Sequence, residues 1–260
     1  MRKSTSMWSS WLTMIAVTVL ASGTAVSAEA GKISANPANG KIIFNQGKGD
    51  VVPACMSCHG ENALGLDAMG SPRLANIGYV YIVKQLTDFA ADRRVPSGLG
   101  AVMNGFAKEL SEQDRRDVAA YVDSLPRKFE PSDLKALKEE GQQVGQTYLG
   151  KLLAHSGVKG KVASCYSCHG FNGRGADPMF PRIGNQKYVY LVNQLKSWRD
   201  GTRANDPVVG GVHMMQAVAK TLTDDDIYNV AAYLSSAEPV NVRDGLIIDN
   251  QTVLKEIIVR

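Results

Sequence analysis

The sequence contains few of the residues that usually bind metals or form cross-links: only four cysteines and four histidines in 260 residues. All four cysteines lie in two short motifs, so no thiol is left for another role. The formal net charge of +4 is small and spread along the chain. Nucleic-acid binding, which needs a concentrated basic face, is therefore not supported. After the first thirty residues, no stretch is long and apolar enough for a bilayer span of roughly 20 residues.

The N-terminal segment has the composition of a secretory signal. A charged start at Arg2 and Lys3 precedes a mostly apolar run over residues 12–20 and the small residues Val26-Ser27-Ala28. We therefore expect residues 1–28 to be a signal peptide and the mature protein to be periplasmic. The alternative is an uncleaved segment that acts as an anchor and keeps the protein at the membrane surface.

One pentapeptide pattern occurs twice, as Cys55-Met56-Ser57-Cys58-His59 and as Cys165-Tyr166-Ser167-Cys168-His169. Two cysteines separated by two residues and followed directly by histidine is the spacing that attaches a c-type haem. The thiols form thioethers with the porphyrin vinyl groups, and the adjacent imidazole reaches the iron from one face. The pattern predicts two covalent haems, with cofactor-binding Cys55, Cys58, Cys165 and Cys168 and iron-ligating His59 and His169.

Paired cysteines have three other common roles: a four-cysteine zinc site, a dithiol redox switch and a structural disulfide. Zinc can use two CxxC pairs, but it does not require a histidine directly after each pair. A thioredoxin-like dithiol expects a βαβ context, which the sequence lacks. Duplication, the secretory signal and the trailing histidines together favour haem.

The chain is internally duplicated. Residues 71–86 match 180–195, and 103–121 match 215–233. The offset is 110 residues at the haem motif and 112 at the methionine that begins the last matching segment. We expect a first domain over 29–125, a linker over 126–143, a second domain over 144–237 and a C-terminal extension over 238–260, in which β-branched residues suggest a hairpin or a strap.

Both copies have the periodicity of helices. Apolar side chains recur three and four residues apart in two matching stripes, Tyr79, Ile82, Val83, Leu86 and Phe89, and Tyr188, Leu191, Val192, Leu195 and Trp198. Ser111 three residues before Asp114, and Thr223 three before Asp226, are capping signals for the last helix of each copy. Strand-like alternation is nearly absent between residues 40 and 236, so the predicted fold class is all-α.

A c-type iron also needs a ligand on its far face, and methionine is the common one. Met103 and Met215 lie 44 and 46 residues after their histidines, just before the last helix of each copy, and we favour them. Met69 and Met179, ten residues after theirs, are the rival pair. A loop that short would have to wrap the haem edge at once, which leaves little chain to build a pocket.

The second copy has two further candidates next to Met215, namely Met214 and His213. The repeat favours Met215 because the residues that follow it align with those after Met103. We expect His213 and His155, which have no histidine counterparts in the first copy, to be surface or loop residues. A haem bound by His213 would have a much lower potential.

Groups near the haem can also be anticipated. Pro72 and Pro181 follow the two motif histidines by 13 and 12 residues, and their carbonyls are candidates to accept the second ring proton of each imidazole. The alternative is that each proline only begins a helix. Arg73 and Arg182 come next and either pair with haem propionates or are solvated surface charges.

These residues resemble the periplasmic dihaem cytochrome c4 family, over roughly residues 38–236. The matching segments are Val52-Pro53-Ala54-Cys55, Phe180-Pro181-Arg182, Asn193-Gln194-Leu195, 201–207 and 215–234. The resemblance implies two cytochrome c domains related by an approximate twofold axis, with haems facing each other across the interface. It also places the axial methionine roles on Met103 and Met215. Members of that family pass electrons between membrane oxidoreductases and terminal acceptors.

The expected function is that of an electron carrier without enzymatic activity, because iron held by histidine and methionine has no open position for substrate. Its expected partners are redox proteins: a membrane oxidoreductase, a terminal oxidase or a dehydrogenase. The alternatives are the electron-accepting subunit of a dehydrogenase complex and, less favoured, a dihaem enzyme such as a peroxidase or a thiosulfate-oxidising type. Lys and Arg number ten against eleven Asp and Glu in residues 29–125, and ten against six in 144–237. This asymmetry would orient docking.

Overall fold

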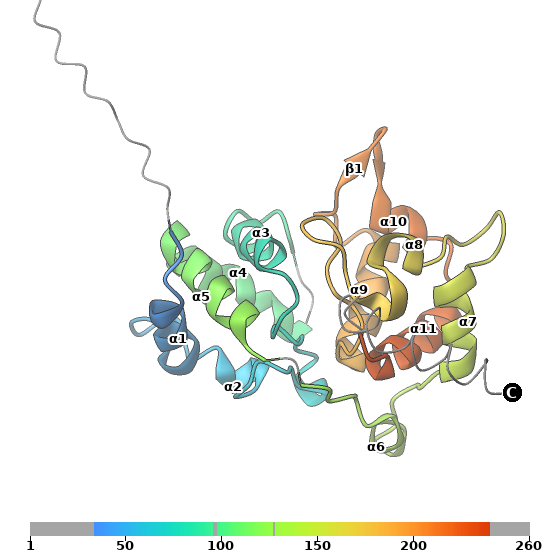
Figure 1. Cartoon of the computed structure of the whole chain (residues 1–260), viewed down its shortest axis with the longest axis horizontal. Helices are drawn as coiled ribbons and strands as arrows, with labels where there is room; N and C mark the ends of the chain where they lie inside the picture. Colours follow the sequence, from blue (N-terminus) through green and yellow to red (C-terminus); the bar gives the residue numbers. More distant parts are fainter. Residues whose placement is uncertain (1–33, 96–97, 127, 240–260) are drawn as a thin grey trace, which may run out of the picture. The chain divides into compact units, whose positions relative to one another are not determined.

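The computed structural model describes residues 34–95, 98–126 and 128–239, and these residues are mostly helical (Figure 1). The expected signal peptide and nearly all of the expected C-terminal extension lie outside the described residues. Within the described ranges, the only two strands, β1 (Val208–Val209) and β2 (Val212–His213), form one short antiparallel hairpin. In the same ranges, none of the helices has the length and apolar character of a membrane span. The all-α prediction is confirmed, and the hairpin is a minor addition to it.

In the part of the chain that the structure describes, each half contributes five corresponding helices, which confirms the duplication. The first half has α1 (Pro37–Gln46), α2 (Met56–His59), α3 (Tyr79–Ala90), α4 (Val102–Glu109) and α5 (Glu112–Ser124). The second has α7 (Thr147–Ser156), α8 (Tyr166–His169), α9 (Tyr188–Asp200), α10 (Met214–Ala219) and α11 (Asp224–Ser236). Helix α6 (Leu134–Glu139) lies between them, and short 3-10 turns cover Asp67–Met69, Gly98–Ala101 and Phe171–Gly173.

The predicted capping signals are present at both final helices. The Ser111 hydroxyl accepts a hydrogen bond from the backbone N–H of Asp114, whose carboxylate accepts one from the Ser111 N–H in return. Thr223 and Asp226 form the same reciprocal pair at α11. Each box satisfies N–H groups that the first turn of a helix leaves without partners.

The first and last helices of each half cross at a glycine. A Cβ atom on Gly40 of α1 would lie 2.0 Å from the Asp117 carbonyl oxygen of α5. On Gly150 of α7 it would lie 1.8 Å from the Asn229 carbonyl oxygen of α11. Helices α1 and α5 pack together in Figure 1, as do α7 and α11. Only glycine permits backbones to approach this closely.

Two apolar cores correspond to the two halves. Phe44, Ile82 and Val122 are buried in the first core, and Tyr188, Ile227 and Val230 in the second. The predicted stripes of α3 and α9 contribute to these cores. The buried residues of α3 also include Gln85 and Asp88, which an apolar periodicity does not anticipate.

The segment between the halves packs against the second one. The side chain of Leu137, in α6, is buried in the core of the second half. The Ser132 hydroxyl accepts a hydrogen bond from the backbone N–H of Tyr188, the first residue of α9. The partial helix expected from about residue 132 is therefore present, and it is tied to the following domain.

Hydrogen bonds between the two halves are reciprocal. The Arg73 guanidinium donates to the Asn185 side-chain oxygen over 2.6 Å, and the Arg182 guanidinium donates to the Asn76 carbonyl over 2.8 Å. The two arginines are 109 residues apart, and so are the two asparagines. Reciprocal contacts between equivalent residues are what a twofold axis produces. The two halves are therefore related by pseudo-twofold symmetry.

Candidate haem sites

The two CxxCH motifs form short helices of identical construction. Both motif histidines are buried at the ends of α2 and α8. The Nδ1 atom of His59 lies 3.0 Å from the Pro72 carbonyl oxygen, and that of His169 lies 2.8 Å from the Pro181 carbonyl oxygen. The predicted role of the two proline carbonyls is therefore confirmed.

These contacts fix the protonation of both rings. Burial lowers the pKa of His59 and of His169, and the hydrogen bond to proline opposes this only in part. The imidazoles are therefore neutral near pH 7. Because a carbonyl oxygen can only accept, Nδ1 carries the proton and Nε2 keeps its lone pair. A neutral ring with a free Nε2 is the form that ligates a metal.

The cysteines have the properties of attachment sites. All four are free of disulfides and half-buried. Burial raises the pKa of the Cys55 and Cys165 thiols to about 11. A redox-active dithiol needs the opposite, a depressed pKa that exposes a thiolate. Across the described ranges, no three His, Cys, Asp or Glu side chains gather as a metal cluster, which leaves the zinc alternative without support.

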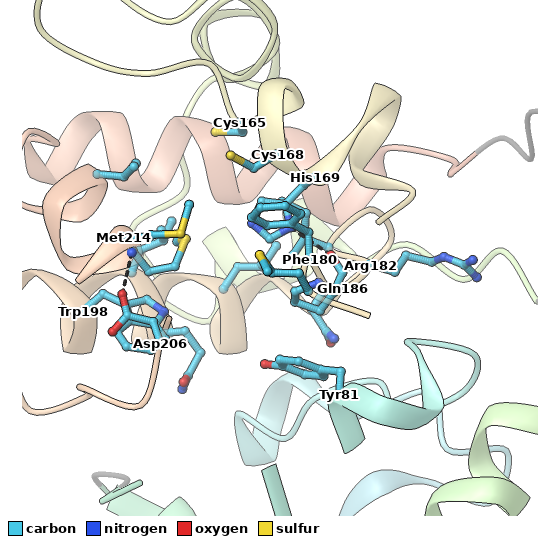
Figure 2. Close-up of a pocket in the computed structure, with 18 of the residues that line it drawn as sticks. Tyr81, Cys165, Cys168, His169, Phe180, Arg182, Gln186, Trp198, Asp206 and Met214 are labelled. Atoms are coloured by element: carbon cyan, nitrogen blue, oxygen red, sulfur yellow. Dashed lines mark hydrogen bonds between the residues drawn. The ribbon is translucent and has the colours of Figure 1, made fainter. Parts of the chain in front are cut away.

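A cavity of about 260 Å³ lies beside the second motif. Figure 2 shows Cys165, Cys168 and His169 together at one part of this cavity, with Trp198 and Tyr81 elsewhere on its wall. Most of the remaining lining is apolar, with side chains from α9, α10 and α11. An apolar cavity with thiols and one imidazole at its edge suits a porphyrin.

The favoured methionines occupy equivalent positions. Met103 is the second residue of α4 and Met215 is the second residue of α10. Met215 lines the cavity beside His169, as do the rivals Met214 and Met179. Met179 has 55% of its surface exposed. The cavity lining alone therefore does not distinguish the three methionines as iron ligands. Met215 is favoured because it has the same position in α10 that Met103 has in α4.

The two remaining histidines differ in their surroundings. His155, on α7, is exposed and packs against the Tyr166 ring, as expected of a surface residue. His213 ends β2, and its Nδ1 lies 2.8 Å from the Asp206 carboxylate. Its side chain is 37% exposed.

A buried pair of arginines, Arg94 and Arg203, was not anticipated from the sequence. The Arg94 guanidinium donates to the Tyr190 hydroxyl over 3.1 Å and to the Gln194 amide oxygen over 2.9 Å, both in the other half. The Arg203 guanidinium donates to the Tyr81 hydroxyl over 3.1 Å. The two arginines are 109 residues apart, as are Tyr81 and Tyr190, and Gln85 and Gln194. This shared offset is the sequence signal that could have revealed the cluster.

The arginine pair carries positive charge without a neighbouring carboxylate. No ion pair of Arg94 or Arg203 exists among the described residues, and the buried Arg94 Nε has no hydrogen-bond partner there. Burial alone raises the pKa of the Tyr190 hydroxyl, and the two cations more than reverse this. Unpaired buried charges are costly. Since Arg203 also lines the cavity, the cluster fits the carboxylates of haem propionates.

Arg73 and Arg182, the residues predicted to bind propionates or to be surface charges, make contacts across the two halves, and Arg182 also lines the cavity beside the second motif. Both bond the asparagine of the opposite half. Arg73 is only 5% exposed, so a solvated surface charge is the wrong description of it.

Comparisons with known proteins agree with this construction. A model of the cytochrome c family matches residues 37–126 and 156–238. A thiosulfate dehydrogenase electron acceptor of Stutzerimonas stutzeri (strain A1501) is 34% identical over 206 residues, covering 78% of this chain and 88% of the relative. A cytochrome c4 of Stutzerimonas stutzeri is 34% identical over 203 residues, covering 76% and 89%.

The same relationship extends to solved structures. The thiosulfate dehydrogenase (TsdBA) from Marichromatium purpuratum superposes with a TM-score of 0.67 at 30% identity. The match covers 79% of this chain but only 41% of that one.

Two helical domains, each with an attachment motif and a carbonyl-oriented histidine, define a dihaem electron-transfer protein. The chain belongs to the cytochrome c family, as a dihaem member of the cytochrome c4 type. It carries two covalently attached c-type haems, at Cys55 and Cys58 and at Cys165 and Cys168. It shuttles electrons between redox partners.

Proposed function

We propose that His59 with Met103, and His169 with Met215, are the axial ligand pairs, and that the protein is a carrier rather than an enzyme. The observation that carries this proposal is the orientation of both histidines by proline carbonyls at 3.0 and 2.8 Å. This contact leaves Nε2 of each ring free to bind iron, and His169 lines the same cavity as Cys165 and Cys168. The equivalent positions of Met103 and Met215 on α4 and α10 support the second ligand.

Each haem, when bound, supplies one reversible electron at its iron. The residues of the chain determine how that electron is held. Methionine as the second ligand raises the reduction potential and occupies the position that a substrate would need. Arg94 and Arg203 would hold propionates at the boundary between the halves.

A redox titration followed by absorption spectroscopy tests the ligand pairs. The wild-type protein is expected to show two haems per chain, each with the charge-transfer band of methionine-ligated iron. Met103→Ala and Met215→Ala are each expected to remove about half of that band. The matched controls are Met69→Ala, Met179→Ala and Met214→Ala, which should leave it intact. Loss of the band in Met214→Ala, with retention in Met215→Ala, would contradict the assignment.

We further propose that the electron donor is a thiosulfate dehydrogenase. The support is the similarity to a thiosulfate dehydrogenase electron acceptor and to part of the TsdBA structure. The protein would then accept electrons from the dehydrogenase in either case, as a free carrier or as a permanently bound subunit. The signal-like composition of residues 1–28 supports the proposal that this role is performed in the periplasm.

Rapid mixing of the oxidised protein distinguishes these roles. Thiosulfate alone is expected to leave the haems oxidised, and thiosulfate with a catalytic amount of a thiosulfate dehydrogenase is expected to reduce both. Co-purification with that dehydrogenase at high salt would identify a permanent subunit. Turnover of thiosulfate or peroxide by the isolated protein would show that it is itself an enzyme.

The uneven charge of the two halves bears on docking. Basic and acidic residues nearly balance in 29–125, whereas basic residues exceed acidic ones, ten to six, in 144–237. The second half is therefore expected to attract an acidic partner surface, with a rate that falls as ionic strength rises. Rates that do not respond to salt would rule this orientation out.

A further inference from the structure

Three potential iron ligands stand side by side where α10 begins: His213, Met214 and Met215. Which of them binds the iron determines the reduction potential of the haem, because an imidazole in place of methionine gives a much lower potential. The loop before them is also longer than in the first half. Twelve positions separate Arg203 from Met215, against nine between Arg94 and Met103.

The longer loop contains the β1–β2 hairpin, with Gly210 and Gly211 at its turn. Gly210 and Gly211 both have positive φ, of 57° and 79°, as a two-residue hairpin turn requires. Val208, Val209 and Val212 are all more than half exposed. The hairpin itself therefore has few packing contacts that could hold α10 in place.

One buried carboxylate connects this loop to the helix. The side chain of Asp206 is only 2% exposed. One of its oxygens lies 2.8 Å from His213 Nδ1, and the other accepts the backbone N–H of Met215 over 2.6 Å. The N–H of Gln216 approaches the same oxygen at 3.4 Å. Asp206 thus contacts both His213 and the backbone of Met215.

The contact with His213 has a chemical consequence. A carboxylate only accepts hydrogen bonds, so His213 Nδ1 donates. In the tautomer whose proton is on Nδ1, the lone pair of the ring is on Nε2, the atom that could bind iron if the ring were released from Asp206. The bond to Asp206 holds the ring at the carboxylate. The bond from the Met215 N–H to Asp206 helps to fix the start of α10, together with the bond from the Met214 N–H to the Pro207 carbonyl over 3.1 Å.

We propose that Asp206 is a positioning residue that selects Met215 over His213 as ligand of the second haem. This inference depends on the proposed ligand pair His169 and Met215. The sequence of the first half has no corresponding pair of an aspartate and a histidine. At the matching offset it has Ser97, and it has no histidine beside Met103. The effect of changing Asp206 should therefore be confined to one haem, and the other haem serves as an internal reference.

The test is a spectroscopic redox titration of the full-length dihaem protein with Asp206→Ala. We expect the methionine charge-transfer band to fall toward about half of its wild-type intensity and a low-potential haem to appear. Asp206→Asn retains an oxygen for the Met215 N–H and should restore most of the band. In the double variant Asp206→Ala/His213→Ala no imidazole can compete, so the low-potential haem should vanish.

Asp226→Ala is the matched control, because Asp226 caps α11 in the same domain and contacts neither candidate ligand. It should lower stability without changing ligation. The inference is overturned if Asp206→Ala gives the same spectrum and potentials as Asp226→Ala. It is also overturned if the low-potential haem persists in the double variant. A wild-type protein with only one methionine-ligated haem would instead refute the proposed ligand pairs.

Discussion

Replacing Gly150 by alanine should destabilise the second half, although alanine is the better helix former. Gly150 lies within α7, where alanine is favoured over glycine by about 1 kcal/mol. The added Cβ would meet the Asn229 carbonyl oxygen at 1.8 Å, its carbon at 2.4 Å and the Tyr233 Cβ at 2.9 Å. Two of these are backbone atoms of α11 and cannot rotate away.

The steric cost therefore exceeds the propensity gain. Overpacking a well-packed contact costs about 1–3 kcal/mol or more, and a clash with helix backbone belongs at the upper end. Subtracting the helix gain leaves a net loss of about 2 kcal/mol. For a protein of this size that lowers Tm by roughly 4–8 °C.

Gly105→Ala is the matched control. Gly105 also lies within a helix, α4, but a Cβ there would meet nothing within 4 Å. It should raise stability by about 0.5–1 kcal/mol. Thermal and guanidinium unfolding of the haem-loaded proteins measures both variants. If Gly150→Ala were neutral or as stabilising as Gly105→Ala, the inferred close crossing of α7 and α11 would be wrong.

Two further predictions concern the boundary between the halves. Burial raises the pKa of the Asp88 carboxyl, but hydrogen bonds from Lys84, Asn205 and Arg93 outweigh it and lower the pKa below its usual range. Asp88 should therefore contribute to stability above its unfolded pKa of about 3.9 and lose that contribution as the pH falls further. Unfolding from pH 7 to pH 3 should show the wild-type advantage over Asp88→Asn shrinking; a constant difference would count against it. Arg203→Gln removes a buried cation beside the cavity and should lower the potential of the second haem, whereas exposed Lys220→Gln should not; equal titration curves would refute this.

The haem ligands on one side could be predicted because a local pattern encodes them. CxxCH places two thiols and an imidazole within one helical turn, so spacing alone defines the site. The proline carbonyls were also predictable, since they follow each histidine at nearly the same distance in both copies. The capping boxes are equally local, three residues from end to end.

The role of the arginines was not predictable in this way. Arg73 and Arg182 were assigned to propionates or to the surface, and their hydrogen bonds to the opposite half were not foreseen. Arg94 and Arg203, whose acceptors are about a hundred residues away, were missed. Gln85 and Asp88 were missed for the same reason. They lie on the buried face of α3, where both accept hydrogen bonds from Asn205 of the other half.

The sequence by itself determined that this protein attaches two haems, that it consists of two copies of one helical unit, and where the last helix of each unit begins. These features depend on neighbours within a few residues or on identity between copies. Only the tertiary structure decided which polar groups meet across the two halves, and that Asp206 joins His213 to the start of α10. Such contacts depend on how the packed cores orient distant side chains, which no local spacing records.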